Sequence, residues 1–420
     1  MNILYDPLLF VLLSLVVVGG AVVGLRLLPV HHRILVPLVL VFVIPADQIS
    51  VLAGDRQGSF VLAVVVIAVC ASITRVRRII LVRSDWDIQF LLVASLALRA
   101  IHAEMGRVRS ILFWCIAGFV LLWIRSEGAS PDTVRRQILN ALLLSGSITA
   151  TVAIFARLGL GDVANMFPGY EPVIGELSIA GSVRSVGVSG HALRLGTLCM
   201  LSTLVALSRL YEDNVSRIGR AMMVTLGCLS MGGLILSAAR GSWLGFVAGA
   251  TFSIVWGTYR GHWQRSMWVG IALVVVIGAV WVVGGGTIVM DRLFGESVAQ
   301  GSLDQRREAI EAVRHVWTRS PIIGVGMGGV EDAVRSVGMS VPDIENEYLI
   351  GLVATGIIGL ISLVGCVMRR AWLGLAERGG RSSQSALAAI LGIGVNLGTY
   401  NLFAWSAGPS LLISIACLCL

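Results

Sequence analysis

The sequence contains no lysine, and only 13% of its residues are charged. All 32 residues counted as Lys or Arg are therefore arginines, which excludes a lysine nucleophile, a lysine Schiff base and the lysine of a phosphate-binding loop. Any basic side chain that contacts phosphate must be Arg or His. Charged residues make up roughly 25% of an ordinary soluble domain, whereas here 56% of the residues are hydrophobic and the mean hydropathy is +0.87. A soluble fold could not bury this much apolar surface, so the composition predicts a polytopic membrane protein.

The seven cysteines lack the spacing of a metal site or of a disulfide framework. All of them lie in apolar runs, and none forms a Cys-x-x-Cys pair. We interpret them as small core side chains, and we expect no metal and no cofactor. The net charge of +8 favours basic cytoplasmic loops over nucleic-acid binding in a protein of this kind.

Long apolar runs recur along the whole chain. A transmembrane helix needs about 20 mainly apolar residues, and about 12 or 13 runs approach that length. The predicted spans lie near 7–28, 34–52, 59–74, 88–103, 110–124, 138–158, 192–210, 221–237, 242–257, 267–284, 348–368, 385–402 and 407–420. The fold class is therefore all-α and polytopic, with residues 1–420 forming a single integral membrane domain.

The arginines sort into alternate loops between these spans. Eighteen of the 32, accompanied by seven acids, fall in one set of loops, which the positive-inside rule places in the cytoplasm. The other set then faces outward. It includes the extracytoplasmic loop 285–347, the smaller extracytoplasmic loop 159–191 and the short turn 238–241.

The loop 285–347 is the only sizeable segment outside the predicted spans. Ser302 to Gln305 reads as a capping box, which marks the start of a helix. Apolar residues then recur at helical spacing, at Leu303, Ile310, Val313 and Trp317. Pro321 ends this helix, and the glycines of 324–329 predict a flexible turn. We expect an amphipathic helix that lies on the outer membrane face as a lid.

Three carboxylates, those of Asp343, Glu345 and Glu347, sit within five residues immediately before a predicted span. Charges at membrane depth are costly and tend to be functional. At the interface the cost is smaller, so a solvated collar at the end of the span is the alternative interpretation.

The stretch that begins at Asn346 reads Asn-Glu-Tyr-Leu-Ile-Gly-Leu-Val-Ala-Thr-Gly-Ile-Ile-Gly and ends at Gly359. It resembles the signature of the O-antigen polymerase and ligase family, which is His-Asn, nine residues, Gly, two residues, and then Gly or another small residue. Glu345 occupies the place of the family histidine. Polymerase-like members tolerate an acidic residue there, and the more distant peptidoglycan polymerases use an Asp as base, so a carboxylate suits this position.

Three further stretches support the resemblance. Residues 184–191 resemble the family's Arg-x-x-Gly element, although the usual Pro-Asn is here Gly-His. Residues 236–242 resemble its Ser-Arg-Gly turn between two spans. Arg306, Trp317 and residues 321–326 resemble the long-loop pattern that ends in Pro-x-x-Gly-x-Gly.

The resemblance, which covers roughly residues 138–370, implies a bacterial glycosyltransferase of GT-C type in the inner (cytoplasmic) membrane, with its active site facing the periplasm or exterior. Such an enzyme is inverting and metal-independent. It transfers glycan from undecaprenyl pyrophosphate to an acceptor glycan, so its partners are the lipid-linked oligosaccharide, the acceptor and membrane lipids. Whether a chain-length regulator also binds is left open. Glu345 in place of His favours a polysaccharide polymerase, and an O-antigen ligase that transfers glycan to lipid A core or to protein is the alternative.

A second alternative, from another class, is a membrane transporter or a flippase for lipid-linked oligosaccharides, because about a dozen spans is a common number for transporters. Transporters usually bind their substrate near the bilayer midplane on broken helices. Here the polar residues gather instead in loops on one predicted face.

The resemblance also implies a set of donor-binding residues. The leaving group of a lipid-pyrophosphate donor gains negative charge, and a guanidinium binds phosphate oxygens bidentately. Arg184 and Arg240 lie at outward ends of predicted spans, where the pyrophosphate would lie. Arg306, His191 and Arg194 extend the same predicted phosphate site.

The acceptor hydroxyl must lose a proton as it attacks, and a positioned base contributes roughly 10²–10⁴-fold to such a reaction. Glu345 is the candidate base, and Asn346 would hold the acceptor or orient Glu345. Tyr348 would stack on a sugar ring, or serve as an interfacial anchor. His191 and His315 are the alternative bases.

Overall fold

The computed structural model describes a large part of the chain in separate stretches. These are residues 34–43, 85–101, 107–126, 130–159, 178–179, 182–183, 185, 187–189, 191–212, 215–280, 296–326, 329–338, 344–376, 383–400, 402 and 408–418. Among the sequence predictions, the spans near 7–28 and 59–74, together with Arg184 and Asp343, lie outside the described residues.

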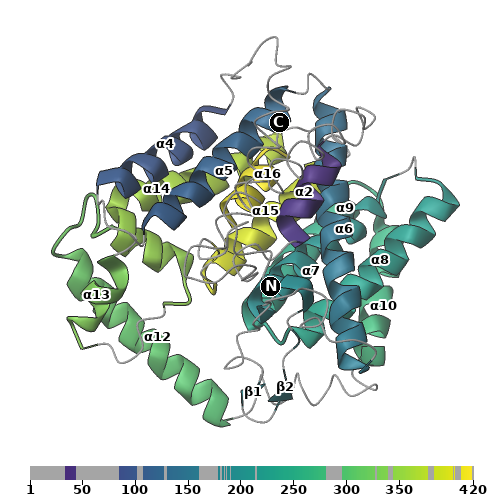
Figure 1. Cartoon of the computed structure of the whole chain (residues 1–420). Helices are drawn as coiled ribbons and strands as arrows, with labels where there is room; N and C mark the ends of the chain where they lie inside the picture. Colours follow the sequence, from purple (N-terminus) through teal and green to yellow (C-terminus); the bar gives the residue numbers. More distant parts are fainter. Residues whose placement is uncertain are drawn as a thin grey trace, which may run out of the picture.

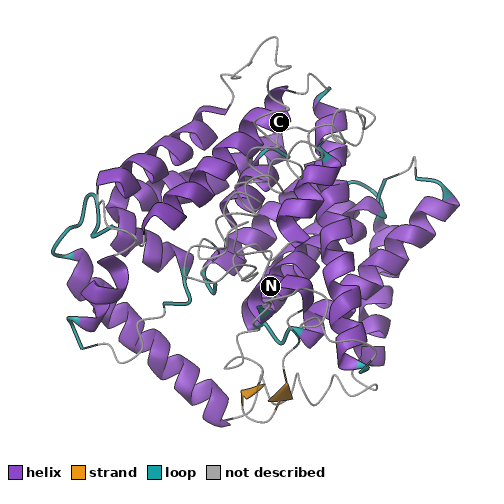
Figure 2. Cartoon of the chain, viewed as in Figure 1, coloured by secondary structure: helices purple, strands orange, loops and turns teal. Residues whose placement is uncertain are grey.

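Helices dominate the described residues (Figure 2). They are α2 (Leu35–Val43), α4 (Trp86–Ile101), α5 (Arg107–Ser126), α6 (Pro131–Arg157), α7 (Ala192–Arg209), α8 (Arg217–Leu236), α9 (Arg240–Tyr259), α10 (Trp263–Val280), α12 (Glu296–Trp317), α13 (Val330–Arg335), α14 (Glu347–Ala376), α15 (Ser383–Leu397) and α16 (Gly408–Ala416), together with the 3-10 turn η6 (Gly187–Ser189). Two short strands, β1 (Ser178–Ile179) and β2 (Ser182–Val183), pair antiparallel. The predicted all-α fold class is confirmed.

Four helices in the described part of the chain, α6, α7, α8 and α14, are long and apolar enough to cross a membrane. All four overlap predicted spans: α7 and α8 agree with their predicted bounds within a few residues, whereas α6 begins earlier and α14 extends further than predicted. The start of α6 follows from its sequence, because the Ser130 hydroxyl accepts a hydrogen bond from the Thr133 amide and Pro131 occupies the first turn.

The central helix α7 is buried along nearly its whole length and packs against α6, α8, α9 and α15. Hydroxyls join three of these helices: the Ser230 side chain lies 2.7 Å from that of Ser202 and 3.1 Å from that of Ser147. Small residues also let α9 and α15 approach closely, since a side chain at Gly245 would collide with the Gly392 carbonyl. This contact sets the position of the C-terminal end of α15, on which the candidate site depends.

The long loop differs from its prediction at two points. Helix α12 begins at Glu296, so Ser302 to Gln305 lie inside the helix and the predicted capping box is wrong. The residues from Glu296 to Gly301 are already helical, so the helix starts upstream of Ser302. The buried face of α12 also differs from the predicted one. Ala309, Val313 and Val316 pack inward, whereas Ile310, which was predicted to lie on the apolar face, is exposed.

Figure 1 shows α13 at the left side of the view, α12 running down from it, and the β1–β2 pair at the bottom. Helix α12 packs against α13 and the first part of α14, through an apolar cluster that includes Val316, Val334 and Val353. The loop helix is therefore attached to the membrane bundle through α14, whose first residues carry the predicted family signature.

Candidate functional site

The C-terminal end of α15 is the point at which several of the predicted site residues meet. The Asn346 side chain donates a hydrogen bond from Nδ2 to the Gly398 carbonyl at 2.8 Å. The Tyr348 hydroxyl donates to the Gly394 carbonyl at 2.7 Å. The His191 ring stacks on Tyr400, with 6.1 Å between ring centroids. The residues just before α14 and α7 are thus held against one short segment, 394–400.

Arg240 reaches the same region as the first residue of α9. The tight turn between α8 and α9 holds Ala238 at φ +49°, a left-handed conformation that is uncommon for a residue with a side chain. A side chain at Gly241 would overlap Thr399, so α9 begins in close contact with the end of α15. The predicted short turn between these two helices is confirmed.

The charges of Arg306, on α12, and of Glu345 both act on Arg240. Burial lowers the pKa of the Arg240 guanidinium, the positive charge of Arg306 lowers this pKa further, and the negative charge of Glu345 raises it. The side chains of Arg306 and Glu345 are exposed. These three side chains, which are distant in the sequence, therefore interact electrostatically, and we call them the Arg240 cluster: Arg240, Arg306 and Glu345.

Asn346 has a structural role that its sequence position did not reveal. Its Oδ1 atom accepts a hydrogen bond from the Leu349 amide at 3.1 Å, as an N-terminal cap of α14 does. Since its Nδ2 atom binds the Gly398 carbonyl, both ends of the amide fix the backbone next to Glu345.

The signature glycine Gly356 marks a break in α14. Its φ of +63° and ψ of −163° interrupt the helix, and a side chain there would overlap the Ile322 carbonyl. The loop before α13 fills the break: the Val325 and Gly326 amides donate to the carbonyls of Val353 and Ala354, both at 2.9 Å.

The Ile357 amide completes the connection by donating to the Pro321 carbonyl at 2.9 Å. Two residues of the predicted glycine turn, Val325 and Gly326, are therefore held by backbone hydrogen bonds to the broken helix, while the Gly324 amide donates to the Ser320 carbonyl. The Pro-x-x-Gly-x-Gly loop and the Asn-x₉-Gly signature, which are separate in the sequence, form one structure.

The Arg-x-x-Gly element is described only in part, and Arg184 lies outside the described residues. The next residue, Ser185, donates its amide to the Leu236 carbonyl at 3.1 Å, so this element lies beside the end of α8. His191 caps α7, because its Nδ1 atom accepts from the Leu193 amide at 3.1 Å. Arg194 is buried in the first turn of α7, and His315 is exposed on α12.

Two features of the site were missed by sequence reasoning. The Asn396 side chain links Thr197 of α7 to Ser242 of α9, at 2.7 and 3.4 Å. The signal was present, since Asn396 interrupts the apolar run 385–402. Glu347 is the second feature: its side chain is almost fully buried, whereas Glu345 is exposed. Sequence alone could not separate these two carboxylates.

No group of three or more His, Cys, Asp or Glu side chains that could hold a metal ion occurs in the described part of the chain. The described side chains at the site carry guanidinium, carboxylate, imidazole and amide groups. Cations beside a carboxylate suit an anionic ligand that reacts by proton transfer.

Comparison with known proteins bears on this site. Residues 223–364 match the model of a family described as O-antigen ligase. The matched segment contains Arg240, Arg306, Glu345 and both glycines of the signature. A search of curated proteins found no match.

The fold and the matched segment together define the class: a polytopic membrane protein that handles glycans. The match confirms the resemblance noted from the sequence: residues 223–364 are similar to the family described as O-antigen ligase.

Proposed function

We propose that the protein is an inverting, metal-independent glycosyltransferase that polymerises glycan repeat units carried on undecaprenyl pyrophosphate. The observation that supports this proposal best is the Arg240 cluster, in which two arginines and one carboxylate of the matched family segment interact electrostatically. The reaction would take place on the outer face of the bacterial inner membrane.

The arginines would bind the donor. As the bond between the anomeric carbon and the pyrophosphate breaks, the leaving group keeps the electron pair and gains negative charge. Arg240 and Arg306 would stabilise that charge, because preorganised cations lower the barrier when charge develops next to them. Arg184, which precedes the segment tied to the end of α8, and His191 with Arg194 at the start of α7 would extend the same site.

The acceptor hydroxyl would lose its proton to Glu345 as its oxygen attacks the anomeric carbon from the opposite face. This single displacement inverts the configuration of the sugar and leaves the proton on the carboxylate. An exposed carboxylate next to two arginines is accessible to an incoming glycan. Asn346 would keep Glu345 in place through its two backbone hydrogen bonds.

Tyr348 would line the glycan-binding surface next to Glu345, although its hydroxyl already anchors the end of α15. The proposal of a polymerase over a ligase rests on Glu345, which stands where family members of the ligase type carry His. A ligase would use the same donor site and differ in its acceptor.

The test uses the full chain purified in detergent, with an undecaprenyl-pyrophosphate-linked repeat unit as donor and acceptor. A polymerase converts this single substrate into a ladder of longer lipid-linked glycans, resolved on a gel. A ligase leaves the repeat unit unchanged until lipid A core is added. A transporter or flippase makes no longer glycan under either condition, and this result would contradict the proposal.

A further inference from the structure

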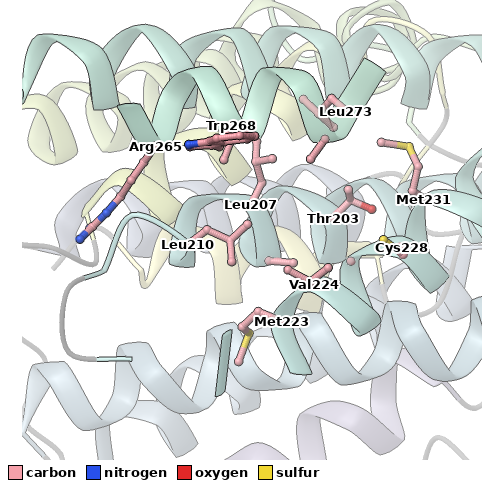
Figure 3. A pocket seen from close by; sticks show the side chains of 14 residues that line it. Thr203, Leu207, Leu210, Met223, Val224, Cys228, Met231, Arg265, Trp268 and Leu273 are labelled. Atoms are coloured by element: carbon pink, nitrogen blue, oxygen red, sulfur yellow. The ribbon is translucent and has the colours of Figure 1, made fainter. Parts of the chain in front are cut away.

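An apolar cleft lies at the end of the bundle opposite the Arg240 cluster. Its volume is about 420 Å³, and it opens between α8 and α10 over the C-terminal half of α7 (Figure 3). The residues that line it include Leu207, Met223, Val224, Trp268, Val269 and Leu273. Arg240, Arg306 and Glu345 are not among the residues that line it.

The residues that line the cleft suit an apolar ligand. The Thr203 hydroxyl, a polar group in the floor, already donates to the Cys199 carbonyl at 2.7 Å. The floor residues Leu207 and Met223 are buried, whereas the wall residues Val224 and Trp268 are 48% and 64% exposed. An open cleft with an apolar lining and a volume in the range of roughly 300–1,000 Å³ is typical of a small-ligand site.

The surroundings of the cleft are those of a surface in contact with lipid. Exposed apolar side chains flank it on both helices, at Met222 of α8 and at Met267, Ile271 and Val274 of α10. Helix α10 packs against α9, and the cleft separates it from α8. A membrane lipid can therefore enter from the side without crossing a polar barrier.

The mouth of the cleft carries positive charge. Arg265 lines it one helical turn ahead of Trp268 and Val269, and the Arg265 guanidinium donates to the Tyr211 carbonyl at 2.9 Å. On α8, Arg220 lies one turn ahead of Met223 and Val224, just outside the lining residues. Because α8 and α10 both begin at this end, the two arginines stand where a lipid headgroup would lie.

We propose that this cleft binds one anionic phospholipid, with an acyl chain between α8 and α10 and the phosphate at Arg265 and Arg220. The charge at the mouth favours an anionic headgroup over a zwitterionic one. A guanidinium carries five N–H donors, so Arg265 can hold the Tyr211 carbonyl and also contact phosphate. This site is separate from the donor site, and it would stabilise the packing of α10 against the bundle.

The test is lipid titration of the full chain in detergent, followed by native mass spectrometry. Phosphatidylglycerol, phosphatidylethanolamine and undecaprenyl phosphate are compared as ligands. We expect one phosphatidylglycerol to bind, at least about fivefold more tightly than phosphatidylethanolamine. The proposal would be overturned if undecaprenyl phosphate bound more tightly than phosphatidylglycerol and the cleft variants described below weakened that binding. The cleft would then be assigned to the prenyl carrier.

The variants test the two parts of the site separately. Ala272→Phe fills the cleft from α10 and is expected to abolish binding, while Val274→Phe, on the same helix but outside the lining, leaves it unchanged. Arg265→Ala is expected to weaken phosphatidylglycerol binding about fivefold, and Arg265→Lys to retain it. Arg260→Ala is the charge control, because Arg260 lies over Trp256 away from the cleft. Wild-type affinity in Ala272→Phe would refute the acyl-chain assignment.

Discussion

Arg240 owes its position to residues that carry no charge. Ala238 adopts a left-handed conformation in the turn before α9, and Gly241 allows the helix to start in contact with Thr399. The guanidinium is then partly buried next to Arg306 and Glu345. Partial burial strengthens the interaction of a cation with a bound phosphate, because less water screens it.

Arg240→Ala is therefore expected to weaken binding of the lipid-pyrophosphate donor about 10- to 100-fold, as the loss of a charged hydrogen bond predicts. Arg260→Ala is the matched control at the other end of α9, where the side chain lies over Trp256. Titration of each purified variant with a fluorescent donor measures its donor affinity. Equal affinities for the two variants would refute the role of Arg240.

The sequence predicted the site residues well where they belong to a motif. It predicted them poorly where their role depends on packing between helices. The turn 238–241 and the residues of the Arg240 cluster could be found from the sequence. The double hydrogen bonding of Asn346 could not, because its partner Gly398 lies on another helix. The contrast between exposed Glu345 and buried Glu347 likewise depends on how α14 meets the bundle.

At the scale of elements, α14 and the loop before α13 form one unit. The break at Gly356 exposes backbone groups, and the loop residues Pro321, Val325 and Gly326 bind the groups on either side of it. Within a membrane, a broken helix needs such partners for its backbone. The unit holds α12, and with it Arg306, at a fixed place relative to Glu345.

Gly356→Ala is expected to destabilise the protein by at least about 1–3 kcal/mol, since a residue with a side chain is strained at this φ. The added methyl group would also overlap the Ile322 carbonyl. Gly351→Ala is the control in the same helix, because a side chain there meets no other atom within 4 Å. Thermal unfolding in detergent compares the two variants, and equal midpoints would contradict this account of the break.

Helices were the elements that the sequence predicted most reliably, because apolar runs mark them directly. The ends of α12 show the limit: Pro321 follows the helix end as predicted, whereas the apparent cap at Ser302 lies inside the helix. Whether a capping pattern marks a helix start depends on the helical propensity of the residues before it. Here the residues before Ser302 are themselves helical, so the pattern does not mark the start.

At the scale of the whole molecule, the far end of α14 is fixed by a buried group of charges. Arg370 donates from Nε to Asp87 at 2.8 Å, and Arg369 forms an ion pair with the same carboxylate at 2.6 Å. Asp85 pairs with Arg370 and with Arg125 of α5. Arg370, Asp85 and Asp87 are almost fully buried, so the group ties α4, α5 and α14 together.

Arg370→Met removes the most buried cation of this group, and we expect a loss of about 3–5 kcal/mol because the carboxylates stay buried. The control is Arg335→Met, whose partner Glu331 and own side chain are both 60% exposed and whose loss costs about 0–1 kcal/mol. Chemical unfolding in detergent measures the difference. A similar small effect for both variants would contradict the structural role of the buried group.

The sequence predicted that Arg125, Arg369 and Arg370 belong to one side of the membrane, and the structure places them at one end of the bundle. It did not predict their pairing with Asp85 and Asp87, because ion pairs between distant helices leave no pattern in the chain. Which end faces the cytoplasm stays a prediction from the positive-inside rule.

The central claim is that Glu345 is the base in glycan polymerisation. The most direct test is the rate of chain extension by purified protein carrying Glu345→Gln or Glu347→Gln, normalised to folded protein. The account predicts a loss of roughly 10²–10⁴-fold for Glu345→Gln with donor binding preserved, and no more than a severalfold change for Glu347→Gln. Chain extension by Glu345→Gln at the wild-type rate would contradict it.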